Sequence, residues 1–206
     1  MDLLKLNENF YLKTQVYFNT SRQSPWPGWQ KLLKHLRGDS LQVLDLGCGN
    51  GRFGKFLSAH RQIDYTGIHN NQYLLDAAAK KLPRARLIRH DLTTPWPIKD
   101  NFDLVAILAV MHHLPQPCRA LLLKRAVTCL NPGGILFLSF WEFNKTKGKN
   151  IGNNDYILSW KLGITAKRYC HLYTQEEIDG LIKPLNLQLL VNFIADTSNR
   201  YLILQK

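Results

Sequence analysis

The chain has 206 residues, of which 45% are hydrophobic and 20% are charged, a composition that suits a globular domain with a sizeable core. We expect one domain over residues 1–206, because this length leaves little room for a second. Nowhere do eighteen uncharged apolar residues run together, and the opening residues lack a long apolar stretch. The sequence therefore predicts neither a membrane span nor a signal peptide, and we expect a cytoplasmic location.

The formal net charge is +12, and basic residues cluster at 80–89 and again at 145–168. Lysine and arginine give sequence-independent affinity for polyanions through counterion release, although a merely basic surface is the alternative. Aromatic residues interleave the second cluster and can stack on bases, or belong in part to the core. The charge pattern favours a nucleic-acid partner.

Four cysteines are scattered without a C-x-x-C pair, so we expect reduced thiols. The sequence shows no metal site. Adjacent His112 and His113 cannot both face one metal from a regular helix or strand, and no H-E-x-x-H motif accompanies them.

In chain order, a helical segment is expected over residues 1–38, followed by a glycine-rich turn. Residues 42–44 are apolar enough for a central parallel strand, and residues 45–51 read D-L-G-C-G-N-G. Alternate glycines let the backbone turn without Cβ clashes and approach a ligand closely. Asp45 lies where it can pair with a positive group of that ligand. The pattern predicts a nucleotide-cofactor loop.

Residues 49–54 also match the dinucleotide fingerprint G-x-G-x-x-G. A dinucleotide site needs an acid about twenty residues further on to hold the ribose hydroxyls. The second predicted strand ends in His69 instead. The dinucleotide interpretation is therefore the weaker one.

Helices and strands alternate after the glycines, which predicts a doubly wound, mostly parallel sheet. The expected elements are a helix at 51–60, a strand at 63–68, a helix at 71–81, strands at 86–89 and 102–110, a helix at 116–130 and a strand at 135–140. The helix at 116–130 stops at N-P-G-G, residues 131–134, an efficient break and turn.

The last part of the chain is expected to close the sheet. Residues 174–177 read T-Q-E-E, a capping box that opens a helix through about 183. Two apolar runs, 187–194 and 201–204, then form a hairpin-like pair. Before this helix lies a basic, aromatic insertion, residues 142–173, beyond the carboxyl edge of the strands where ligands bind. We expect it to bind the substrate.

The register D-x-G-x-G-x-G at 45–51 resembles class I S-adenosylmethionine-dependent methyltransferases. Four further stretches look like one branch, the tRNA methyltransferases that esterify 5-carboxymethyluridine at the wobble position: FNTSRQSPWP at 18–27, AVMHHL at 109–114, DYILSW at 155–160 and RYCHLY at 168–173. The resemblance extends over nearly the whole chain. It implies a Rossmann-like sheet with an antiparallel C-terminal strand, S-adenosylmethionine as cofactor with S-adenosylhomocysteine as product, tRNA as partner and, in eukaryotic members, a small zinc-binding activator subunit.

The resemblance also assigns cofactor-binding positions. It implies that Asp45 and the glycines wrap the methionine end, while Asp91 and the backbone of Leu92 recognise adenine. A carboxylate that accepts the adenine amino group makes a strong charge-assisted contact, and a turn-forming acid is the alternative for Asp91. The candidate cofactor-binding residues are Asp45, Gly47, Cys48, Gly49, Gly51, His69, Asn70, Asp91, Leu92 and Ala109.

The candidate residues for the acceptor also follow from the resemblance. Those expected to be catalytic are Arg22, His113, Asp155, Arg168 and His171. Those expected to bind substrate are Trp141, Trp160, Lys145, Lys147 and Tyr169. Three of these residues have a purely structural alternative: a surface position for Arg22, loop packing for His113 and a core position for Trp160.

The type of acceptor decides which of these residues is needed. A carboxylate nucleophile needs no base, but it needs a cation to bring it into a partly apolar pocket, and Arg168 or Arg22 can grip it with a planar fork. An amine or hydroxyl acceptor would need a general base, for which His113, His171 or Asp155 could serve.

Three positions depart from the branch. His69 stands in place of the ribose-binding acid, Ser159 in place of proline and Cys170 in place of tyrosine. Hydrogen bonds to a charged group contribute roughly 1.5–3 kcal/mol, so the loss of the acid weakens cofactor binding about ten- to a hundredfold unless His69 or Asn70 holds the hydroxyls. A small-molecule methyltransferase and a non-catalytic RNA- or partner-binding module therefore stay open as alternatives.

Overall fold

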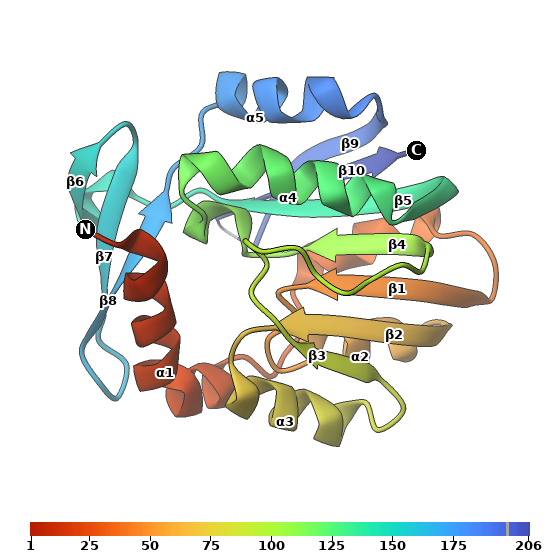
Figure 1. Cartoon of the computed structure of the whole chain (residues 1–206), viewed down its shortest axis with the longest axis horizontal. Coiled ribbons are helices and arrows are strands. Elements are labelled where there is room, and N and C mark those ends of the chain that lie inside the picture. Colours follow the sequence, from red (N-terminus) through yellow and green to blue (C-terminus); the bar gives the residue numbers. More distant parts are fainter. Residues whose placement is uncertain (197) are drawn as a thin grey trace.

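The computed structural model describes residues 1–196 and 198–206, so Thr197, in the turn expected between the last two strands, lies outside the described residues. A seven-stranded sheet has the order β3-β2-β1-β4-β5-β10-β9 (Figure 1). Its strands are β1 (Ser40–Leu46), β2 (Gln62–His69), β3 (Arg86–Arg89), β4 (Phe102–Ile107), β5 (Leu130–Trp141), β9 (Gln188–Ala195) and β10 (Asn199–Gln205).

The first five strands pair in parallel, whereas β10 runs antiparallel to both β5 and β9. The predicted class I methyltransferase sheet with an antiparallel C-terminal strand is thus confirmed. The strand order reverses between β1 and β4, and ligands of such sheets bind at the carboxyl ends of the strands beside this reversal.

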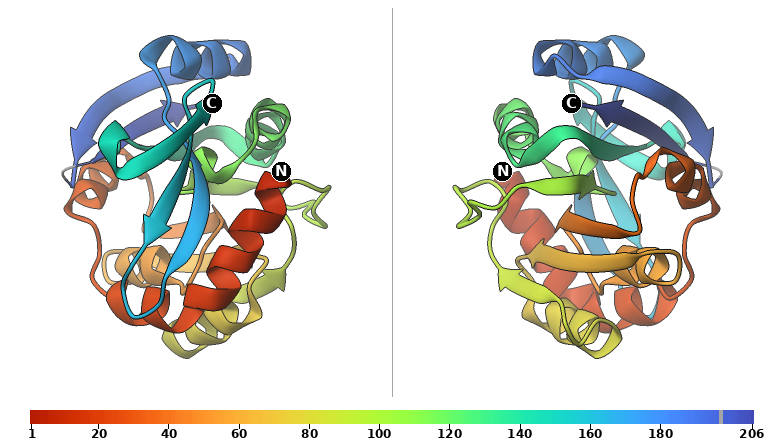
Figure 2. Two further views of the ribbon diagram at one scale, coloured as in Figure 1. Left: turned by 90° about the vertical axis from the view of Figure 1, so that its left-hand side faces the viewer. Right: turned by 90° about the vertical axis from the view of Figure 1, so that its right-hand side faces the viewer.

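The core has two halves, one on each face of the sheet, because successive side chains of a strand point to opposite faces. On one face Leu44 and Val105 pack beneath α4 (Gln116–Thr128) and α5 (Gln175–Ile182). On the other, Val43 and Leu104 pack with the 3₁₀ helix η1, α2 and α3. These three elements span Pro27–His35, Arg52–Ser58 and Gln72–Lys81. Helices therefore lie on both sides of the sheet (Figure 2).

Two strand ends differ from the sequence prediction because of contacts with residues distant in sequence. β4 ends at Ile107, because Ala109 adopts a left-handed backbone with φ 57° and donates its N–H to Ser139 Oγ at 2.8 Å. β5 begins at Leu130, earlier than expected, because the N-P-G-G segment stays in the ladder, with the Gly133 N–H bonded to the Lys206 carbonyl at 2.9 Å. The predicted capping box at Thr174 is confirmed.

The insertion at 142–173 forms a small antiparallel sheet of β6 (Gly148–Gly152), β7 (Asp155–Trp160) and β8 (Ala166–His171), preceded by the 3₁₀ helix η3 (Lys145–Lys147). This sheet and the N-terminal helix α1 (Leu3–Ser21) lie in front of the carboxyl ends of the parallel strands, as the left view of Figure 2 shows. The insertion is therefore placed beside the expected ligand site.

The side chain of Asn7 fastens α1 to β8. Its amide nitrogen donates to the His113 and Tyr169 carbonyls at 3.0 and 3.2 Å, and its oxygen accepts from the Tyr169 N–H at 2.8 Å. Asn7 shares a buried helix face with Phe10 and Thr14. None of the helices in the described parts of the chain has the length and apolar character needed to cross a bilayer.

Candidate functional site

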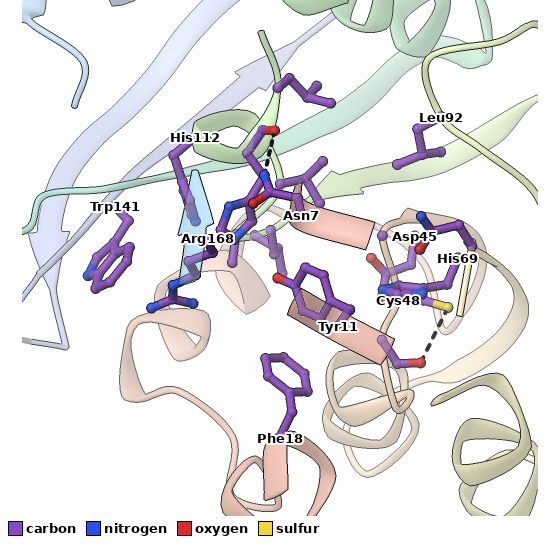
Figure 3. A pocket seen from close by; sticks show the side chains of 18 of the residues that line it. Asn7, Tyr11, Phe18, Asp45, Cys48, His69, Leu92, His112, Trp141 and Arg168 are labelled. Atoms are coloured by element: carbon purple, nitrogen blue, oxygen red, sulfur yellow. Dashed lines mark hydrogen bonds between the residues drawn. The ribbon is translucent and has the colours of Figure 1, made fainter. Parts of the chain in front are cut away.

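A cavity of about 980 Å³ opens at the carboxyl ends of the parallel strands. It is lined by α1, by the turn after β1, by the ends of β2, β3 and β4, and by β8. Figure 3 shows Arg168 and Trp141 at one end, Asp45 and His69 at the other, and Tyr11 between them. One continuous space therefore joins the expected cofactor and acceptor ends.

The turn after β1 has the tight backbone that its glycines predict. Gly47, Gly49 and Gly51 have φ values of 90°, 53° and 72°. The Gly47 and Cys48 N–H groups donate to the Ile68 carbonyl at 2.9 and 3.1 Å, which holds the turn against β2. A Cβ on Gly47 would lie 2.2 Å from Val110 Cγ2, so only glycine fits there.

Asp45 forms the floor of the cavity beside this turn. It is buried, and its Oδ2 accepts a 2.6 Å hydrogen bond from the Tyr65 hydroxyl. Burial raises the pKa of Asp45 to about 7, although the Tyr65 hydrogen bond and the charge of Arg52 oppose that shift. A ligand ammonium group would stabilise this carboxylate and would itself be stabilised by it.

Further along the cavity, residues at the ends of β2 and β3 offer polar groups. His69 and Asn70 follow one another at the end of β2, and Asp91 and Leu92 follow β3. Asp91 Oδ1 accepts from the backbone N–H and the hydroxyl of Thr93, both at 2.9 Å. One oxygen thus shapes the turn, which leaves the other available to a ligand.

Most of the expected cofactor-binding residues line this cavity. Those that do are Asp45, Gly47, Cys48, Gly49, His69, Asn70, Asp91, Leu92 and Ala109. Gly51 is not among the lining residues and instead provides the N-cap of α2. Asp45, the glycine turn, the polar residues His69 and Asn70, and Asp91 follow the ends of β1, β2 and β3, which are neighbours in the sheet. These residues fit S-adenosylmethionine.

Two arginines face the opposite end of the cavity. The guanidinium carbon of Arg168 lies 4.7 Å from the ring centre of Trp141 and 5.2 Å from that of Phe10. That of Arg22 lies 5.7 Å from the rings of both Phe18 and Trp160. Such contacts stabilise a cation without neutralising it. We call Arg22 and Arg168 the arginine pair.

The arginine pair lacks an anionic partner. Among the residues that the structure describes, neither Arg22 nor Arg168 forms an ion pair with a carboxylate, and the buried Nε of Arg168 has no hydrogen-bond acceptor. Burial lowers the pKa of Arg22, and the nearby Arg168 lowers it further. Two cations without a carboxylate partner at one end of a cavity are suited to an anionic ligand.

The two histidines after β4 lie between the ends of the cavity and are uncharged. His113 donates from Nδ1 to the Tyr169 carbonyl at 2.9 Å, and burial, with a smaller effect from Arg168, lowers its pKa to about 3. Burial also lowers the pKa of His112, whose ring packs 5.6 Å from Trp141. Both rings line the cavity as neutral groups.

Asp155 and His171 do not line the cavity. Asp155 Oδ1 accepts from the Tyr169 hydroxyl at 2.7 Å and lies 2.6 Å from His171 Nδ1. His171 Nε2 lies 3.1 Å from Glu177 Oε1, and Arg119 donates to the Tyr169 hydroxyl at 2.9 Å. This network, with His171 buried at its centre, links β7 and β8 to α4 and α5. It thereby positions Arg168, which precedes Tyr169.

The expected substrate-binding residues also separate in space. Trp141 lines the cavity, and its Nε1 donates to Ser198 Oγ at 3.0 Å. Trp160 is not a lining residue and packs behind the arginine pair. Lys145 and Lys147 are exposed on η3, outside the lining of this cavity.

Among the lining residues that were not predicted, Tyr11 and Asn50 make the contacts that matter most for the site. Tyr11 points its ring into the cavity, 6.1 Å from His69 and 5.8 Å from His113. Asn50 is buried and donates from Nδ2 to Asn19 Oδ1 at 2.8 Å and to the Arg22 carbonyl at 3.0 Å. No motif marks Tyr11. Asn50 lies inside the glycine run, where its polarity is a usable signal.

Comparison with known proteins agrees with this geometry. Residues 43–134 match a family model described as a methyltransferase domain. A putative methyltransferase of Encephalitozoon cuniculi is 30% identical over 177 residues, which cover 81% of this chain and 80% of that protein. The chain therefore belongs to the class I S-adenosylmethionine-dependent methyltransferases, and its cofactor is S-adenosylmethionine.

Two other relatives carry a more particular name. The tRNA (carboxymethyluridine(34)-5-O)-methyltransferase of Schizosaccharomyces pombe is 25% identical over 222 residues, covering 95% of this chain and 94% of that protein. The corresponding enzyme of Macaca fascicularis, ALKBH8, is 31% identical over 149 residues, covering 70% of this chain but 22% of that protein. Among solved structures, an S-adenosylmethionine-dependent methyltransferase from Clostridium acetobutylicum has a TM-score of 0.73 at 15% identity, covering 95% of this chain and 98% of that chain.

Proposed function

We propose that this methyltransferase esterifies a carboxylate carried by tRNA, of the carboxymethyl-uridine type at the wobble position. The observation that carries the proposal is the arginine pair, Arg22 and Arg168, which faces the cavity without a carboxylate partner among the described residues. Planar guanidinium groups match a carboxylate in geometry and charge. The acceptor end is therefore suited to an acidic group.

This reaction requires no acid–base catalysis by the protein. Bound S-adenosylmethionine supplies an electrophilic methyl group on its sulfonium. A carboxylate oxygen of the acceptor forms a bond to this carbon as the carbon–sulfur bond breaks, the bonding pair goes to sulfur, and no proton moves. The arginine pair holds the nucleophile, and the apolar walls exclude water, so the rate gain comes from positioning.

The neutral histidines support a carboxylate acceptor over an amine or a hydroxyl. A general base works best with a pKa near the operating pH, whereas the pKa of His113 is about 3 and that of His112 is also well below its usual value. Asp155 and His171 bond to one another outside the lining of the cavity. We therefore assign Asp155 and His171 to positioning and His113 to the cavity wall.

Two observations support tRNA as the carrier. The relatives in Schizosaccharomyces pombe and Macaca fascicularis are named as tRNA carboxymethyluridine methyltransferases. Lys145, Lys147 and Lys149 are exposed on η3 and β6, within the insertion whose β8 carries Arg168. Exposed lysines in this insertion offer contacts to a phosphate backbone.

The test is transfer of a labelled methyl group to tRNA that contains carboxymethyluridine, with tRNA lacking this modification as the control. We expect label only in the modified RNA, and we expect mild alkali to release it, because esters are labile and N-methyl and ether groups are not. Label in the unmodified RNA, alkali-stable label, or preferential labelling of free small carboxylates contradicts the proposal.

Variants separate the two parts of the proposal. Arg168→Ala should lower the rate of transfer at least a hundredfold, while Arg168→Lys retains charge without the planar fork and falls between. Binding of S-adenosylhomocysteine should change little in either. Replacing Lys145, Lys147 and Lys149 by alanine should weaken RNA binding and lower the slope of log affinity against log salt by about one per lysine.

A small zinc-binding activator remains a predicted partner, and co-purification with a candidate subunit is its test.

A further inference from the structure

His69 occupies the place where nucleotide-binding sheets of this topology put a ribose-binding acid. It is the last residue of β2 and lines the cavity between the glycine turn and the Asp91 turn. An acid there accepts hydrogen bonds from ribose hydroxyls. The next two residues, Asn70 and Asn71, are amides, so this stretch of the wall carries no carboxylate.

The tautomer of the His69 ring is fixed by the backbone. The N–H of Asn71 points at His69 Nδ1 at 2.9 Å, so Nδ1 is the acceptor and the ring proton is on Nε2. Burial lowers the pKa of His69 to about 4, which keeps the ring neutral near pH 7. The ring therefore presents one donor and no charge.

Asn71, whose backbone N–H sets this tautomer, is itself held in place by two hydrogen bonds of its side chain. Asn71 is the N-cap of α3, and its side-chain oxygen accepts from the Leu74 N–H at 3.0 Å. Its amide nitrogen donates to Gln15 Oε1 on α1 at 3.1 Å. Tyr11 packs edge-on against the His69 ring, with an angle of 86° between the rings. The backbone donor and the ring are thus held from both sides.

The remaining nitrogen is available to a ligand. Among the residues that the structure describes, the side-chain hydrogen bond of His69 is made by Nδ1, and Nε2 makes none. Figure 3 shows His69 beside Asp45 and Cys48 at the cofactor end of the cavity.

We propose that His69 is a specificity-determining residue that donates its Nε2–H to a ribose hydroxyl oxygen of the cofactor. In the usual site the protein carboxylate is the acceptor and the ribose hydroxyl is the donor, so these roles are exchanged here. A carboxylate accepts from both hydroxyls, whereas the imidazole makes one hydrogen bond in which the sugar oxygen is the acceptor. The inference requires only the class of the enzyme and its cofactor and is independent of the methyl acceptor.

The test is calorimetric binding of S-adenosylhomocysteine and its 2′-deoxy and 3′-deoxy analogues to the native protein and to His69→Phe, which keeps an aromatic ring against Tyr11. We expect one deoxy analogue to bind the native protein roughly three- to tenfold more weakly, the size of one neutral hydrogen bond. In His69→Phe this difference should disappear, and the parent compound should bind more weakly by the same factor. In His69→Asp the difference should widen to about ten- to a hundredfold.

Asn70→Ala tests the competing assignment of this contact, because Asn70 also lines the cavity and offers polar groups. It should keep the native preference among the three compounds. The proposal fails if the native protein binds both deoxy analogues as tightly as the parent compound, or if the preference survives in His69→Phe and is lost in Asn70→Ala.

A second measurement uses the native protein alone, so its outcome does not depend on whether the variants fold. Long-range ¹H–¹⁵N correlation spectra of the native protein should show the His69 proton on Nε2 and a shift of that nitrogen when S-adenosylhomocysteine binds. A proton on Nδ1, or an Nε2 chemical shift that does not change when the ligand binds, overturns the proposal.

Discussion

The side chain of Asn50 donates from Nδ2 to the backbone carbonyl of Arg22 at 3.0 Å. Asn50 belongs to the glycine turn that faces the cofactor, and Arg22 belongs to the arginine pair that faces the acceptor. The same amide also donates to Asn19 Oδ1 at 2.8 Å, near the end of α1. The two ends of the cavity are therefore coupled through one buried side chain.

Replacing Asn50 by alanine removes both hydrogen bonds and leaves the Arg22 carbonyl without this donor. We expect the free energy of unfolding to fall by about 1–3 kcal/mol. We also expect KM for the acceptor to rise more than the Kd of S-adenosylhomocysteine. Denaturant unfolding and steady-state kinetics check this, with Ser58→Ala on the exposed end of α2 as the control. Equal effects on both ligands would show that Asn50 supports the glycine turn alone.

Gly47→Ala should abolish tight cofactor binding. The backbone at Gly47 has φ 90°, and the added Cβ would lie 2.2 Å from Val110 Cγ2. Strain and displacement of the turn should cost about 1–3 kcal/mol of stability. Gly180→Ala is the matched control, because no atom lies within 4 Å of its added Cβ in α5. It should leave binding unchanged and stabilise the helix by about 1 kcal/mol. Similar melting temperatures and affinities for the two variants would contradict this expectation.

Affinity for S-adenosylhomocysteine should depend on pH through Asp45. Its pKa is raised to about 7 by burial, so the free protein carries a partly protonated Asp45 at neutral pH. A ligand ammonium group favours the carboxylate, so binding below pH 7 releases a proton. Affinity should therefore rise between pH 5 and 7, by up to about tenfold per unit. His69 does not interfere, because its pKa is about 4.

Asp45→Asn supplies the control and tests the sign of the pKa shift. The folded-state pKa of Asp45 lies above its unfolded value of 3.8, so its contribution to stability is complete below about pH 4 and is lost as pH rises to about 7. The variant should therefore gain in relative stability between pH 4 and pH 7.5 in denaturant titrations, and its ligand affinity should be weak and flat between pH 5 and 7. A native affinity that is flat over that range would place the pKa of Asp45 elsewhere.

His171→Gln should disturb the acceptor end and spare the cofactor end. The buried imidazole bridges Asp155 Oδ1 at 2.6 Å and Glu177 Oε1 at 3.1 Å, and its loss leaves two carboxylates without their shared partner. We expect a loss of about 1–3 kcal/mol in stability and a raised KM for the acceptor, with an unchanged Kd for S-adenosylhomocysteine. Lys5→Ala, which breaks only the exposed Lys5–Glu8 pair, should cost less than about 1 kcal/mol. A loss in kcat with unchanged KM and stability would restore a catalytic role for His171.

The sheet and its cofactor turn were predictable because local patterns determine them. Alternating helices and strands, the glycine register at 45–51 and the capping box at Thr174 each act within a few residues of chain. The ends of strands were less predictable. β4 stops at Ile107 because Ala109 takes a left-handed backbone stabilised by Ser139, a contact thirty residues away in sequence.

The acceptor end was harder to predict, because it is assembled from distant segments. Asp155 and His171 lie in motifs that suggest chemistry, and only the tertiary structure shows that they bond to each other outside the cavity lining. Tyr11 lies in a helix whose sequence gives no sign of a ligand. Its place between His69 and His113 depends on how α1 crosses the strand ends.

The attachment of α1 to β8 has a consequence for biosynthesis. Asn7 leaves the ribosome well before its partner Tyr169, which follows 162 residues later. At 5–20 residues per second, the helix waits roughly ten to thirty seconds for the strand against which it packs. The glycine turn and its neighbouring strands can form during that interval. The pocket for the acceptor therefore assembles later than the cofactor site, because β8 is synthesised after β1 to β4.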